Sequence, residues 1–107
     1  MKFGIFVFGD NPPEIGRSNQ KYYEEVLTMA EWAEELGFDS LTVWDHMLSA
    51  PGLYGGSWLD PLLVLGCAAG VTERIPLGTH ILVLPIRHPV LLAKELATLD
   101  YMSEGRM

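Results

Sequence analysis

The chain has 107 residues, of which 49% are hydrophobic and 20% charged, and its formal net charge is −7. This length allows one domain with a modest core, and the composition is that of a globular protein. The negative charge argues against nucleic acid as a partner, because a polyanion would be repelled. The single cysteine, Cys67, excludes an intrachain disulfide and a CxxC motif, and favours the reducing cytoplasm.

The first predicted element is a strand, KFGIFVF (2–8), whose nearly continuous apolar run is typical of burial on both faces. The run is too short for a signal sequence or a membrane span, so we expect no membrane partner. From Ser18 to Leu36, apolar residues recur every three or four positions and predict a helix that ends before Gly37. We interpret five acids of this segment as its solvated face: Glu24, Glu25, Glu31, Glu34 and Glu35.

A second strand is predicted over 40–44, and a glycine-rich loop follows as far as Trp58. Asp60 and Pro61 then provide an N-cap acid and a proline at the first helical position, which predicts a helix to about Gly70. This helix has no polar face, so one side must meet the sheet and the other a neighbouring helix or another subunit. We therefore expect a homo-oligomer that associates through residues 61–70.

The third predicted strand is LGTHILVL (77–84), also expected to be buried, and His88 with Pro89 opens a third helix, VLLAKELATLDYM. Strands and helices thus alternate three times, with connections long enough for right-handed crossovers between parallel strands. The fold class predicted from the residues is α/β in a single domain.

An acid and an imidazole, Asp45 and His46, follow the second strand directly. The carboxyl ends of parallel strands are where ligand chemistry gathers in such folds. Imidazole is suited to general acid–base work, and the acid could set its tautomer. The alternative is that Asp45 caps a turn and His46 is a satisfied polar residue. A metal site is not expected, because His46, His80 and His88 lie on different elements without HxxxH spacing.

Two further features near these strand ends have more than one interpretation. His80 lies within an apolar strand, so it is either buried and hydrogen-bonded or placed beside a ligand at a strand irregularity. The glycines of GLYGGS (52–57) lack the GxGxxG order and indicate a mobile loop, not a phosphate site. Trp58 either covers a pocket or anchors this loop.

Three stretches together resemble the opening of the bacterial luciferase-like monooxygenase family: MKFGIFVFGDNPP, ELGFDSLTVWDHM and TERIPLGTHILVLPIRHPVLLAKELATLDYMSEGRM. The resemblance implies a (β/α)8 TIM barrel that uses reduced FMN with oxygen, or a 5-deazaflavin coenzyme in hydride transfer, on a small organic substrate. Asp45 stands where luciferase has a second histidine, and the Trp-Asp-His order is more similar to the deazaflavin-dependent members. We therefore expect the deazaflavin slightly over FMN.

The resemblance also implies the site residues. His46 would be the active-site histidine beside the isoalloxazine ring, and Asp45 would orient or charge the site, so both are candidate catalytic residues. A non-prolyl cis peptide at His80–Ile81 would support the back of the ring. We expect the cofactor to contact Phe8, Thr79, His80 and Ile81.

A TIM barrel takes typically about 250 residues, so we expect residues 1–107 to form only about the first three βα units of one. Two hypotheses follow. The chain is the N-terminal portion of a flavin or deazaflavin oxidoreductase and is inactive alone, or it is a free-standing βα module that acts as a binding or assembly element.

Overall fold

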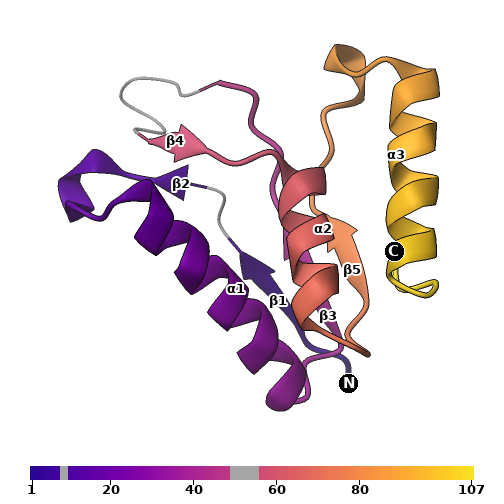
Figure 1. The fold of residues 1–107 in the computed structure, drawn as a ribbon, viewed down its shortest axis with the longest axis horizontal. Helices are drawn as coiled ribbons and strands as arrows, with labels where there is room; N and C mark the ends of the chain where they lie inside the picture. Colours follow the sequence, from indigo (N-terminus) through magenta and orange to yellow (C-terminus); the bar gives the residue numbers. More distant parts are fainter. Residues whose placement is uncertain (8–9, 49–55) are drawn as a thin grey trace.

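The computed structural model describes residues 1–7, 10–48 and 56–107, and its centre is a parallel three-stranded sheet (Figure 1). The strands are β1 (Gly4–Val7), β3 (Ser40–Val43) and β5 (Leu77–Thr79), in the order β1-β3-β5. After them come the helices α1 (Asn19–Glu35), α2 (Pro61–Val71) and α3 (Pro89–Met102). The predicted parallel α/β alternation is therefore confirmed.

The helices begin where their capping residues predicted. Ser18 Oγ accepts a hydrogen bond from the Lys21 N–H at 3.1 Å. Asp60 Oδ1 accepts the N–H groups of Leu62 and Leu63 at 2.9 and 3.3 Å, which satisfies two of the orphan donors of α2. After α1 the chain turns at Gly37, whose φ of 78° lies in the left-handed region that glycine adopts without strain.

The strands are shorter than predicted. The third ends at Thr79 instead of residue 84, and within the rest of the predicted strand the N–H of Val83 donates to the Asp45 carboxylate at 2.9 Å instead of to a neighbouring strand. The chain then forms the 3₁₀ turn η2 (Leu84–Ile86). Three more short elements were not predicted: η1 (Pro13–Ile15) and the antiparallel pair β2 (Asp10–Asn11) and β4 (Ser57–Trp58).

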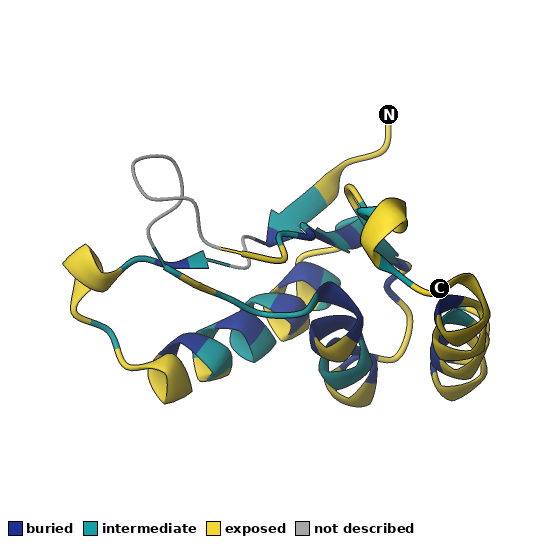
Figure 2. Ribbon diagram, turned by 90° about the horizontal axis from the view of Figure 1, so that it is seen from above, coloured by how far each residue is buried: buried dark blue, intermediate teal, exposed yellow. Residues whose placement is uncertain are grey.

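All three helices lie on one side of the sheet, and its other face is open (Figure 2). Side chains on the helix side form the core; Leu41, Val43 and Leu65 are almost fully buried there. Residues on the opposite face, such as Phe6 and Thr42, are only half-buried. The expectation that the strands are buried on both faces is wrong for this chain, because nothing covers their second face within the described ranges.

Two charged side chains fasten the amino-terminal end of the sheet. The Glu34 carboxylate accepts the N–H groups of residues 73–75, at 3.0 Å from Glu73 and 2.7 Å from Ile75. The Arg106 guanidinium donates to the carbonyls of Ala69, in the last turn of α2, and Thr72, just after the helix, each at 3.0 Å. Glu34 was expected on a solvated face; it instead holds the loop between α2 and β5.

In the part of the chain that the structure describes, no helix combines the length and the apolar character needed to cross a bilayer.

Candidate functional site

Aromatic side chains occupy the open face of the sheet. Phe6 of β1 is in register with Thr42 of β3, and strand alternation directs both away from the helices. The Phe6 and Trp44 ring centroids are 4.5 Å apart, and the His80 ring lies 6.3 Å from Phe6. These residues, with Gly4, Ile5, Ser40 and Thr42, line a hollow of about 370 Å³. The open face therefore offers a hollowed, largely apolar surface.

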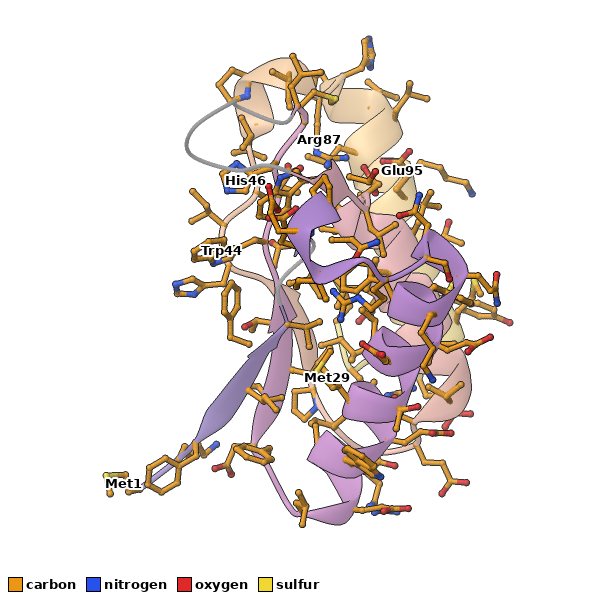
Figure 3. The ribbon with its side chains drawn as sticks, turned by 90° about the vertical axis from the view of Figure 1, so that its left-hand side faces the viewer. Met1, Met29, Trp44, His46, Arg87 and Glu95 are labelled. Atoms are coloured by element: carbon orange, nitrogen blue, oxygen red, sulfur yellow. The ribbon has the colours of Figure 1, made fainter. Side chains whose placement is uncertain are left out.

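His46 lies at the carboxyl end of this face, between two indole rings. Its ring centroid is 4.2 Å from that of Trp58 and 5.8 Å from that of Trp44. Figure 3 shows Trp44 and His46 on the side of the sheet away from α1, with Arg87 at the same end of the molecule. An adjoining hollow of about 330 Å³ is lined by Trp44, Asp45, His46, His80 and Ile81. The imidazole is thus half-buried at the edge of a pocket.

Asp45 faces the other way. It is only 3% exposed, and its two carboxylate oxygens accept hydrogen bonds from Arg87 Nε at 3.1 Å and Arg87 Nη2 at 2.9 Å. Oδ2 also accepts the Val83 N–H at 2.9 Å. Among the described residues, the Asp45 carboxylate is engaged by the loop after β5 and not by the neighbouring imidazole. Its direct role is to anchor that loop.

Arg87 is the centre of a small ionic network. Besides Asp45, its Nη2 donates to Asp60 Oδ2 at 3.1 Å, and Asp60 is also the N-cap of α2. The hydrogen bonds to Asp45 raise the pKa of the guanidinium; burial opposes this, and the bond to Asp60 adds to it. Arg87 therefore remains a fixed positive charge linking three segments of the carboxyl-terminal edge.

The structure separates the four predicted cofactor contacts. Phe8 lies outside the described residues. Thr79 pairs with Val43, so its side chain is on the helix side of the sheet. His80 and Ile81 border the pocket, and the peptide bond between them is cis, as expected. The interpretation of His80 as a buried core residue is wrong, because its side chain is exposed; its N–H donates to the Val43 carbonyl at 2.9 Å.

Sequence reasoning did not identify Arg87 or Phe6 as part of this region. For Arg87 a signal exists: an arginine in the loop after the third strand, at the same sheet edge as two acids that follow strand two and open α2. No group of three or more His, Cys, Asp or Glu side chains able to hold a metal is found in the described ranges.

A parallel βα sheet with an aromatic open face and a polar carboxyl-terminal edge defines a class: an α/β protein, a class in which ligand sites gather at the carboxyl ends of the strands. Comparison with known proteins gives the family. The sequence profile described as "Luciferase-like monooxygenase" matches residues 1–107. The chain belongs to the luciferase-like monooxygenase family.

Similar proteins agree with this assignment. The alkanal monooxygenase beta chain of Vibrio harveyi is 37% identical over 106 residues, which are 99% of this chain and 31% of that protein. The crystal structure of monooxygenase RslO1 from Streptomyces bottropensis is 38% identical and superposes with a TM-score of 0.86, again over 99% of this chain and 31% of the other. The chain thus spans about a third of the length of these relatives.

Similar structures include proteins named for two cofactors. The coenzyme F420-dependent tetrahydromethanopterin reductase of Methanopyrus kandleri is 30% identical with a TM-score of 0.74, over 98% of this chain and 25% of that one. The oxygenating component of 3,6-diketocamphane monooxygenase from Pseudomonas putida, in complex with FMN, is 26% identical with a TM-score of 0.81, over 99% and 28%. At the level of the family, the chain is therefore related to flavin- and F420-dependent oxidoreductases.

Proposed function

We propose that residues 1–107 form about the first three βα units of a barrel oxidoreductase that uses FMN or a deazaflavin to transfer a hydride to, or oxygenate, a small organic substrate. The observation that carries the proposal is the group of Phe6, Trp44 and His46 on the open sheet face, at the strand ends. A planar aromatic cofactor fits a surface of this kind, because ring stacking and burial of apolar area both favour it.

The residues of the chain would divide the work as follows. When bound, the cofactor supplies the electron pair of the redox step. His46, at the pocket edge, would give or take a proton at the cofactor or substrate. Asp45 would act through Arg87, by orienting the loop that carries residues 80–83. Ile81 and the main chain of Thr79 and His80 would support one face of the ring. Phe8 remains a proposed contact.

Binding to the full-length protein tests this function. FMN and F420 are titrated separately: binding of the oxidised forms is followed by the change in their own fluorescence, and binding of the reduced forms, which scarcely fluoresce, by quenching of the tryptophan fluorescence of the protein. Binding of either one supports the proposal, and we expect F420 to bind more tightly because of the Trp44-Asp45-His46 sequence. Failure of both to bind at concentrations up to about 1 mM, a free energy weaker than about −4 kcal/mol, would contradict it.

We propose in addition that the protein forms a homo-oligomer through α2. The groove beside this helix also keeps the assembly-module alternative open. A mostly apolar groove of about 580 Å³ runs between α2 and α3, with Leu63 at its surface and Gly66 among its lining residues. Lys94 and Glu95 also line it. Adjacent opposite charges suit a two-fold interface, because Lys94 of each copy can then pair with Glu95 of the other copy.

We expect this protein in the cytoplasm, since its single cysteine, Cys67, is a free thiol.

A further inference from the structure

Arg87 connects the two chain segments that carry the rings of His46 and Trp58, which are in contact with an interplanar angle of 48°. Its guanidinium binds Asp45, which precedes His46, and Asp60, which lies two positions after Trp58. We infer that Arg87 is a positioning residue that fixes the contact between the His46 imidazole and the Trp58 indole, and so the orientation of the imidazole in the pocket. The inference rests on the proposed function only for the catalytic value of that orientation.

The geometry of the network requires an arginine. Nε and Nη2 form a two-point contact with the Asp45 carboxylate, while Nη2 also reaches Asp60. The side chains of Arg87 and Asp45 are 11% and 2% exposed, so water competes little for these bonds. A lysine has one rotatable ammonium and cannot reproduce the fork. The clamp is therefore directional, and it is shielded from water on its Asp45 side, whereas the Asp60 side chain is 38% exposed.

The clamp acts on two rings that are distant along the chain and meet only in the folded structure. Trp58 is held on one side by the β2–β4 ladder, in register with Asp10, and on the other by Asp60 at the start of α2. His46 follows Asp45 just beyond β3. With both acids on one guanidinium, the two segments keep a fixed separation, and the ring centroids lie 4.2 Å apart. Within the described ranges, Arg87 is the side chain whose hydrogen bonds join Asp45 to Asp60.

The test uses Arg87→Lys in the full-length protein, with Arg106→Lys as the matched control. Arg106 is also an arginine with several hydrogen bonds, but it lies at the amino-terminal end of the sheet. The readouts are the nuclear Overhauser effect between His46 and Trp58 ring protons, and kcat and KM with the bound cofactor. We expect Arg87→Lys to lose the ring contact and about tenfold or more in kcat, with KM changed less, because misorientation acts on the chemical step.

Arg106→Lys should keep the ring contact and kcat even where it lowers the melting temperature. A folded Arg87→Lys protein with an unchanged Overhauser effect would overturn the inference. If Arg87→Lys does not fold, Asp60→Asn replaces it, because asparagine retains the N-cap but not the charge; the ring contact should then weaken, and its persistence would also overturn the inference.

The proposed function and this inference fail separately. A wild-type protein that binds neither cofactor, but whose ring contact depends on Arg87, refutes the former and supports the latter.

Discussion

Asp45 and His46 are neighbours in the sequence but contact different parts of the molecule. Alternation continues past β3: Val43 and Asp45 point to the helix side, and Trp44 and His46 to the open face. The period of two was sufficient to predict this division. The partner of Asp45 was not predictable, because it depends on where β5 stops and on how the loop carrying Arg87 folds back.

Replacement of His46 distinguishes a catalytic from a structural role. If His46 transfers a proton, His46→Ala in the full-length protein should lower the single-turnover rate by about 10²- to 10⁴-fold and leave cofactor affinity within a few fold. The melting temperature should change little. If the residue is structural, the free energy of unfolding should instead fall by about 1–3 kcal/mol. An unchanged single-turnover rate would exclude the catalytic role.

Glu34 gives a prediction for pH dependence. Burial acts to raise the pKa of its carboxyl, but hydrogen bonds from the N–H groups of residues 73–75 outweigh this and, with Arg74, hold the pKa below its ordinary value of 4.5. The folded state thus binds the proton less tightly than the unfolded chain. The stabilisation from Glu34 is complete above about pH 4.5 and is lost as the pH falls through the lower, folded-state pKa.

Glu34→Gln should therefore be less stable than wild type near neutral pH, and the difference should shrink in acid. Urea unfolding between about pH 7 and about pH 3 measures the free energy of unfolding of both proteins. Subtracting the variant value from the wild-type value removes the pH dependence that the other carboxylates contribute to both. Glu31→Gln is the control, because that side chain is exposed on the same helix. A difference independent of pH would contradict the assignment.

At the scale of elements, the helices followed their local signals closely, while the strands did not. Ser18, Asp60 and the prolines at 61 and 89 mark helix starts through chemistry that is local in the sequence. Strand ends depend on partners elsewhere. β5 stops at Thr79, after which the Val83 N–H donates to Asp45 and not to a strand, and the β2–β4 pair joins residues distant in sequence. Neither was accessible to pattern reasoning.

Two glycines of α2 provide a matched pair. Alanine is favoured over glycine within a helix by about 0.5–1 kcal/mol. A Cβ at Gly70 would meet nothing within 4 Å, whereas one at Gly66 would approach Leu99 Cδ2 of α3 to 3.3 Å. Gly70→Ala should thus raise the melting temperature, and Gly66→Ala should raise it less or lower it. Equal gains in melting temperature, measured by circular dichroism, would show that Leu99 of α3 moves away from the added Cβ without a loss of stability.

At the scale of the whole molecule, one sheet face and the α2–α3 groove are both uncovered within the described ranges. Leu63 is 73% exposed at the groove, and burying such surface against a second copy is favourable. We expect self-association at micromolar concentration, detectable by sedimentation equilibrium. The prediction of an apolar α2 was enough to anticipate such a surface, but its shape depends on how α3 packs beside it.

Leu63→Glu should weaken this association by about tenfold or more, because each copy would bury a charge. Ile15→Glu is the control: it places the same charge on an exposed apolar residue of η1, 59% exposed and outside the groove. If both variants associate as the wild type does, the α2 interface is wrong.

The bond from the Leu77 N–H to the Arg106 carbonyl, at 2.8 Å, repeats the one from the Leu41 N–H to the Pro76 carbonyl. Leu41 pairs with Leu77, so the same offset places Met107 opposite Leu77 and extends a cross-strand row that begins at Ile5. Met107 indeed packs against the core. A one-residue insertion between Arg106 and Met107 would move this side chain to the opposite face and put a different residue in the row. Arg106 thus sets the register in which Met107 packs against the core.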